Sequence, residues 1–366
     1  MSLRQENKII VLLGAGASYE AGIPTSPKMT YRLEELLKSN GELSEFRSLY
    51  SFIKSAIYFA DGIIEIPHDK VNYNIERLVN TLSELERKVE HPLYPFIGNW
   101  HNKLTELAGA DFSKVHELKA KIINKLKSSW VLPRTYERSE YYSGLFRFAQ
   151  EYNYPLRVFS LNYDLCVERN TGKFVLERGF GEQSQWNWRN FNEVEADAPN
   201  VYLYKLHGSI DWCRDDNNNL IYVDEISTID PSQLEIIFGT YQKLKYSDPF
   251  LFLAYEFRKW TLESKLIIAI GYGFGDEHIN GILKQALMSA SDSEQRKLLV
   301  VSTFSKLVEL NEKTERNEVR KIERLIGISE DSGQVKIKKM GASDFIGLDM
   351  SIDSLNTYFS ISDSVF

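Results

Sequence analysis

The sequence has only two cysteines, Cys166 and Cys213, in 366 residues. Two thiols cannot build a disulfide framework, and they cannot supply a four-thiolate zinc site. No apolar run approaches the roughly 18 residues that a membrane-spanning helix needs. The N-terminus, MSLRQENK, is polar and contains no secretory apolar stretch. These absences predict a cytoplasmic protein without a membrane anchor or bound zinc.

The chain also lacks an excess of basic residues, since 44 Lys and Arg stand against 51 Asp and Glu. The net charge of −7 argues against nucleic-acid binding driven by the charge of the whole surface. A local exception is residues 113–138, which are either the solvated face of a helix or a contact for DNA or an acidic partner. The basic residues of this run are Lys114, Lys119, Lys121, Lys125, Lys127, Arg134 and Arg138.

Apolar and aromatic residues are plentiful, with 43% hydrophobic residues, 20 Tyr and 20 Phe, so a large core can be buried. Short apolar runs that end in polar or glycine residues predict strands, and helical segments separate several of them. This alternation predicts an α/β fold with a Rossmann-like parallel sheet flanked by helices. The predicted strands are 8–13, 156–164, 201–209, 264–273 and 297–304.

Residues 28–150 are predicted to be mostly helical, because apolar residues recur there at helical spacing. Two such series are Ile75, Leu78, Val79, Leu82, Leu85 and Val89, and Val115, Leu118, Ile122, Leu126 and Trp130. We therefore expect a Rossmann-type core (1–27 and 151–310), a large helical insertion after the first strand (28–150) and a C-terminal extension that completes the core (311–366).

The predicted strands present polar residues at one end. In IIVLLGAGASYEAGIP, residues 9–24, a strand runs into a glycine turn, which lets backbone N–H groups approach an anion, and a following helix would add its positive end. Each residue also has a structural explanation. Asn162 could satisfy a turn, His207 could be a buried core histidine, and Asp276 is placed as a helix N-cap.

Taken in order, the segments GAGAS…AGIP, LNYD, KLHGS and GYGFGDEHI resemble the sirtuin family, most closely the sirtuin-like domains of bacterial antiviral defence systems. The resemblance covers roughly residues 8–305. It implies NAD as substrate, with Asn162 orienting ribose and water and His207 as the catalytic base. The resemblance further implies NAD contacts from Gly14, Ala15, Gly16, Ser18, Asp164, Gly271, Gly273 and Asp276.

The departures from protein deacylases narrow the expected activity. Those enzymes carry a four-cysteine zinc module, and they continue AGIP with an Asp-Phe-Arg segment where this chain has GIPTSPKM. We therefore expect NAD to be cleaved to nicotinamide and ADP-ribose with water as acceptor. By resemblance, the protein would deplete NAD during phage infection as a homo-oligomer, with a partner such as a HerA-type hexameric ATPase or an Argonaute-class protein.

Two alternatives remain open, namely a module that senses NAD or an ADP-ribose derivative without cleaving it, and an NAD-dependent deacylase. A dehydrogenase is disfavoured, because Glu34 and Glu35, the acidic candidates for ribose binding, lie in a predicted amphipathic helix. GASYEAG does not match the GxSxG nucleophile pattern. The histidines other than His207 show no metal-ligand spacing. These are His68, His91, His101, His116 and His278.

Overall fold

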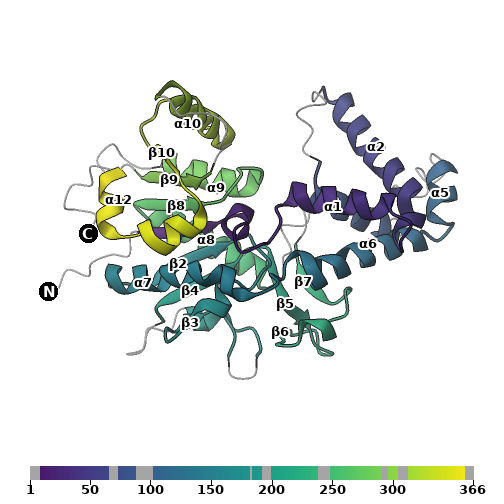
Figure 1. The fold of residues 1–366 in the computed structure, drawn as a ribbon, viewed down its shortest axis with the longest axis horizontal. Coiled ribbons are helices and arrows are strands. Elements are labelled where there is room, and N and C mark those ends of the chain that lie inside the picture. Colours follow the sequence, from purple (N-terminus) through teal and green to yellow (C-terminus); the bar gives the residue numbers. More distant parts are fainter. Residues whose placement is uncertain are drawn as a thin grey trace.

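The computed structural model describes residues 9–65, 73–87, 102–181, 184–191, 199–237, 248–289, 296–303 and 312–358. Its centre is a seven-stranded sheet in the order β10-β9-β8-β1-β2-β4-β3, in which every pair is parallel. Helices flank this sheet (Figure 1), which confirms the predicted α/β class. Its strands are β1 (Ile9–Leu13), β2 (Leu156–Ser160), β3 (Leu176–Glu177), β4 (Val201–Lys205), β8 (Leu266–Ile270), β9 (Lys297–Ser302) and β10 (Val335–Lys339).

The central strand β1 is buried on both faces, because its side chains alternate between two hydrophobic clusters. Ile9, Val11 and Leu13 belong to one cluster, and Ile10 and Leu12 belong to the other. Successive side chains of a strand point to opposite faces, so a strand between two layers of helices must be apolar at every position. This explains why IIVLL contains no polar residue.

The second cluster is completed by α8 (Phe250–Glu263), α9 (Glu277–Met288) and α10 (Glu312–Ile326), which contribute buried leucine, isoleucine and phenylalanine side chains. The first cluster takes in α7 (Ser143–Tyr152), which contacts β2 and β4, together with residues of the C-terminal helices. Those helices are α11 (Ala342–Asp344) and α12 (Ile352–Tyr358).

Between β1 and α7 the described chain is helical and forms a lobe beside the sheet (Figure 1). The buried positions of its helices include Ile75, Leu78, Val115, Leu118 and Ile122, which confirms the helical spacing, while Val89 lies outside the described residues. The helices of this lobe are α1 (Ser26–Lys38), α2 (Arg47–Ile63), α3 (Ile75–Glu86), α5 (Asn102–Ala108) and α6 (Ser113–Lys125), followed by a π-helical turn, Leu126–Trp130.

Two local expectations were wrong. The glycine turn leads into a short 3-10 helix, Ala15–Ser18, and α1 begins only at Ser26, after Gly22 with φ of +96°. The segment 201–209 is not one strand, because β4 ends at Lys205 and Gly208, with φ of +80°, starts β5 of a second sheet. That sheet has the order β6-β5-β7 and is antiparallel, with β5 (Gly208–Arg214), β6 (Leu220–Tyr222) and β7 (Leu234–Ile236).

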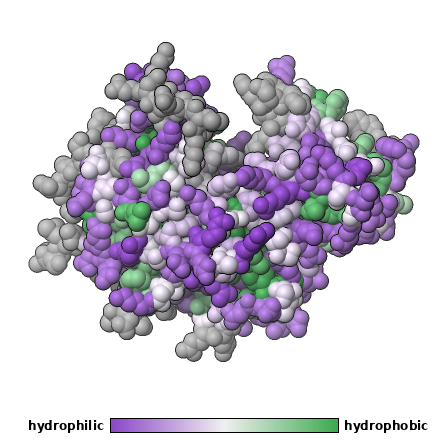
Figure 2. All heavy atoms as spheres, in the orientation of Figure 1, coloured by the Kyte–Doolittle hydropathy of each residue, from purple (hydrophilic) through white to green (hydrophobic). Residues whose placement is uncertain are grey.

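None of the helices in the described ranges is long and apolar enough to cross a membrane. On the face shown in Figure 2, hydrophilic residues predominate and apolar residues form small separate patches. Among the described strands, β10 pairs with β9 alone and forms one edge of the main sheet.

Candidate functional site

The four predicted strand ends lie side by side. In the sheet, β8, β1, β2 and β4 are consecutive neighbours and parallel, so their carboxyl ends share one edge. The strand β1 lies between β2, the next strand of this sheet along the chain, and β8, which comes much later in the sequence. The strand order therefore reverses direction at β1, and ligands of open α/β sheets bind at such a switch point. The prediction that these polar groups converge on one rim is confirmed at the level of topology.

The glycine turn after β1 packs directly against the loop after β8. Gly14 N–H donates to the Ile270 carbonyl and Gly16 N–H to the Gly271 carbonyl, both at 2.9 Å. A Cβ on Gly14 would lie 2.5 Å from Tyr272 Cα, and one on Gly16 would lie 2.8 Å from Gly271 Cα. Close backbone approach therefore requires these two glycines, and their N–H groups are engaged within the protein.

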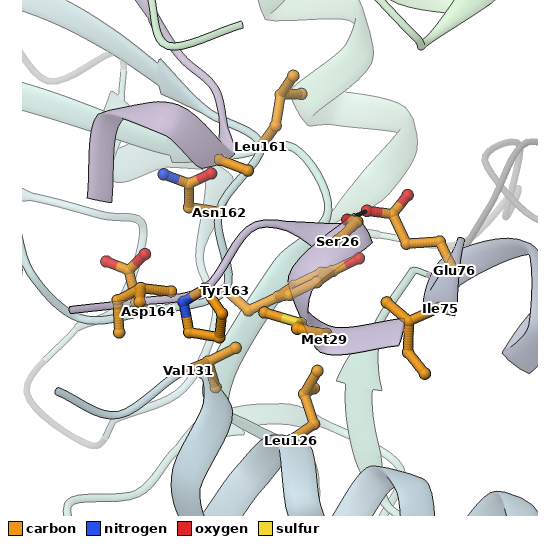
Figure 3. A pocket seen from close by; sticks show the side chains of 13 residues that line it. Ser26, Met29, Ile75, Glu76, Leu126, Val131, Leu161, Asn162, Tyr163 and Asp164 are labelled. Atoms are coloured by element: carbon orange, nitrogen blue, oxygen red, sulfur yellow. Dashed lines mark hydrogen bonds between the residues drawn. The ribbon is translucent and has the colours of Figure 1, made fainter. Parts of the chain in front are cut away.

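Asn162 follows β2 and is held to this turn through its amide nitrogen. Nδ2 donates to the Gly14 carbonyl at 3.0 Å and to Ser18 Oγ at 3.1 Å. The Gly14 carbonyl can only accept, so the side-chain nitrogen must lie on this side. With both amide protons used, the atom left for a ligand is the carbonyl oxygen Oδ1. Asn162 is thus set to accept a hydrogen bond from water or a sugar hydroxyl (Figure 3).

Ser18 is fully buried, and its hydroxyl also bonds to Tyr142 Oη at 2.9 Å. The adjacent Tyr141 stacks on Tyr142 and donates from its hydroxyl to the Ala17 carbonyl at 2.5 Å. Burial raises the pKa of both phenols, so they remain protonated donors. Two tyrosines distant in sequence therefore hold the segment that orients Asn162.

Asp164 is buried in the turn after β2, where its Oδ1 accepts the Cys166 N–H at 3.0 Å. Lys205, at the end of β4, donates from Nζ to the Asp164 carbonyl and lies 3.4 Å from Glu168 Oε1. Burial raises the pKa of Glu168, whereas Lys205 and Arg178 act to lower it. A buried lysine thus ties the Asn162–Asp164 loop to the neighbouring strand.

His207 lies between β4 and β5, and its Nε2 is 3.2 Å from Asp276 Oδ2. Asp276 Oδ1 accepts the N–H of His278 at 3.0 Å and that of Ile279 at 3.4 Å, which confirms the predicted N-cap of α9. Sequence reasoning assigned His207 and Asp276 to separate roles. The structure brings them together.

An open pocket lies where the sheet edge meets the helical lobe (Figure 3). Asn162, Asp164 and Ala15 line it, the last from the glycine turn, so three of the predicted residues share one cavity. The lobe contributes Met29, Ile75 and Glu76, among others, and Ser26 Oγ donates to Glu76 Oε1 at 2.9 Å.

The remaining predicted residues are not among those that line the pocket. His207 is next to it, because its ring centroid is 6.5 Å from that of the lining residue Tyr163. The Tyr163 hydroxyl donates to the Ile237 carbonyl at 2.7 Å, and burial, with the charges of Glu76 and Asp276, raises its pKa. Gly273 is exposed, with nothing within 4 Å of where a Cβ would be.

Sequence reasoning missed Glu76, Tyr142 and Lys205 as parts of this site. Glu76 and Tyr142 stand in helical segments, where nothing in the spacing distinguishes them from other polar or aromatic positions. Lys205 could have been found from the sequence, because a lysine inside the apolar run VYLYKLHGS needs a buried partner.

The basic run 113–138 is partly neutralised within the protein. Lys119 pairs with Glu86 and Lys121 pairs with Glu42, while the buried Lys127 donates to the Ser227 carbonyl at 3.3 Å and to that of Ile229. These contacts favour the solvated-face explanation over nucleic-acid binding.

The two cysteines are buried free thiols, and burial raises the pKa of each. Within the described ranges no group of three or more His, Cys, Asp or Glu side chains could hold a metal ion. Three of the histidines considered as metal ligands, His68, His91 and His101, lie outside those ranges.

Comparison with known proteins gives one family. A sequence model described as "SIR2-like domain" matches residues 156–324, a range that starts at β2 and includes Asn162, His207 and Asp276 but not the glycine turn. No curated protein matches the chain.

Among solved structures, a Sir2 homolog–NAD complex is 12% identical, with a TM-score of 0.42 over 96% of this chain and 90% of that chain. A Sir2–p53 peptide–NAD+ complex is 11% identical, with a TM-score of 0.42 over 97% and 95%. These values are too low to support an argument about function. The match of residues 156–324 to the SIR2-like domain agrees with the motifs that carry the resemblance to sirtuins.

Proposed function

We propose that this protein is an NAD+ glycohydrolase, which cleaves NAD+ with water to nicotinamide and ADP-ribose. The observation that carries the proposal is that Asn162 and Asp164 line one pocket with Ala15 of the glycine turn. The match of residues 156–324 to a SIR2-like domain, a range that contains Asn162 and Asp164, adds support.

The chemistry of the pocket favours the nicotinamide end of NAD+. Its lining is mostly apolar, and its charged side chains are the carboxylates of Glu76 and Asp164. None of its described lining residues is lysine, arginine or histidine. Carboxylates attract the cationic pyridinium and accept hydrogen bonds from its carboxamide, whereas they repel phosphates. The phosphates would then lie outside this pocket.

The reaction needs no general acid to protonate the leaving group. When the C1′–N bond breaks, its electron pair returns to the pyridinium and nicotinamide leaves neutral. The oxocarbenium-like ribose then takes the oxygen of water, and the released proton needs a base. An imidazole suits that role near neutral pH. We assign this proton to His207, and we assign the orientation of the water or the ribose hydroxyls to Asn162 Oδ1.

The test is to incubate the purified protein with NAD+ and quantify products by chromatography. We expect nicotinamide and ADP-ribose in equal amounts without any acylated peptide. Binding without loss of NAD+ over long incubation would instead support a sensor. Turnover only with an acyl-lysine peptide would support a deacylase.

Glu76→Gln tests the charge argument with an isosteric change. A carboxylate near the ring should favour the cationic oxidised nucleotide over the neutral reduced one, since two charges about 4 Å apart attract by about 1 kcal/mol even in water. We expect the affinity for NAD+ to fall about 5-fold or more and that for NADH to change less than 2-fold, by titration calorimetry. Glu117→Gln, at an exposed position of α6, is the matched control. Equal losses for both nucleotides would contradict the assignment.

We extend the proposal to cells on resemblance alone. In cells, the protein would be a cytoplasmic homo-oligomer that depletes NAD during phage infection, together with a HerA-type ATPase or an Argonaute-class partner. Expression in bacteria with and without phage challenge, with NAD measured in each culture, tests this role. NAD that falls only after challenge supports it, and NAD that stays level in challenged cells carrying the partner contradicts it.

A further inference from the structure

The buried contact between His207 and Asp276 has a geometry that constrains the imidazole. Nε2 and Oδ2 are 3.2 Å apart, and the two residues are only 7% and 6% exposed. They come from different loops, one after β4 and one after β8, so the contact exists only because both loops meet at one edge of the sheet.

Asp276 is held through both its side chain and its backbone. Oδ1 accepts the backbone N–H groups at the start of α9, and the Asp276 carbonyl accepts the Tyr272 hydroxyl at 3.1 Å. With one oxygen committed to the helix, the other is directed at His207. The N-cap of α9 therefore also fixes the position of Asp276 Oδ2 relative to the imidazole of His207.

An ionised carboxylate only accepts hydrogen bonds, so the proton of a neutral His207 must sit on Nε2. The lone pair is then on Nδ1. We propose that Asp276 is a positioning residue that fixes this tautomer of His207, makes Nδ1 the basic atom and stabilises the imidazolium formed on proton transfer. This inference rests on the proposed function.

This assignment gives the water proton a defined acceptor. A water proton moves to Nδ1 as the water oxygen bonds to C1′ and the C1′–N electron pair leaves with nicotinamide. The imidazolium keeps its Nε2 proton against Asp276 and later returns the Nδ1 proton to solvent. In the part of the chain that the structure describes, the Tyr163 ring also lies near the imidazole, and the Tyr163 hydroxyl donates its hydrogen bond to the Ile237 carbonyl.

Asp276→Asn separates positioning from capping. Asparagine caps helices about as well as aspartate, and α9 requires an oxygen at the Oδ1 position. The amide NH2 would then face Nε2 and reverse the tautomer. We expect kcat for nicotinamide release to fall about 10²–10⁴-fold, with KM changed less than about 3-fold and the melting temperature within about 2 °C. Asp276→Ala should lose the same activity and melt several degrees lower, because the cap is lost.

Selective ¹⁵N-histidine NMR reads the tautomer without turnover, with His207→Ala used to assign the signal. The expected result is an Nε2–H tautomer in the wild type and an Nδ1–H tautomer in Asp276→Asn. If the wild type shows Nδ1–H, or if Asp276→Asn keeps both its tautomer and its rate, the positioning role is wrong while NAD+ hydrolysis stands. A different outcome is that the tautomers are as expected but the wild type releases no nicotinamide. The tautomer assignment would then hold, whereas the proposed function and the catalytic role of Asp276 would both be wrong.

Discussion

Replacing His207 with alanine is expected to lower the rate of nicotinamide release from NAD+ by about 10²–10⁴-fold, the contribution of a placed general base. Asn162→Ala should have a comparable effect, because it removes the oxygen left to orient water or ribose after both amide protons are used. The measurement is initial rates by chromatography, at saturating NAD+.

The matched control is His278→Ala, which removes an exposed imidazole from the first turn of α9 without touching Asp276's side chain. It should retain the wild-type rate. Circular dichroism and thermal melting should show that His207→Ala and Asn162→Ala remain folded. Wild-type turnover in either of these two variants would refute the assignment of roles, even if the wild-type protein hydrolyses NAD+.

Gly271→Ala is expected to destabilise the protein by about 2–5 kcal/mol. Gly271 has φ of +63°, a left-handed conformation that costs other residues roughly 1–2 kcal/mol. An added Cβ would lie 2.1 Å from Ala17 N and 2.3 Å from Gly16 C, and overpacking of this kind costs about 1–3 kcal/mol. Denaturant unfolding followed by circular dichroism measures the change.

Gly273→Ala, two residues further on, is the control for that variant. Nothing lies within 4 Å of its added Cβ, so its free energy of unfolding should stay within about 0.5 kcal/mol of the wild type. Equal stability of the two variants would mean that the loop after β8 does not hold the glycine turn as described.

The strands and their shared edge could be predicted because each depends on local pattern. A run such as IIVLL is apolar at every position only when both faces are covered, and parallel strands necessarily end at the same edge. The N-cap at Asp276 is also local, since its partners are the next residues of the chain.

Other features could not be predicted because they depend on chain paths rather than on periodicity. Gly208 interrupts the expected strand and starts a second sheet, where its Cβ would meet the Glu235 carbonyl at 2.2 Å. The 3-10 helix after β1 ends before the Gly22 turn, so the α-helix expected after the glycine turn begins only at Ser26. Both outcomes reflect the packing of segments remote in sequence.

The sequence by itself determined the parallel sheet, the helical segment after its first strand and the set of polar residues gathered at one edge, because hydrophobic period and strand direction are properties of the chain alone. Only the tertiary structure decided which of those residues touch. The contacts of Tyr142 with Ser18 and of Asp276 with His207 are pairings between distant segments. They form because helix and loop packing, which no single segment encodes, brings those side chains to within a few ångströms of one another.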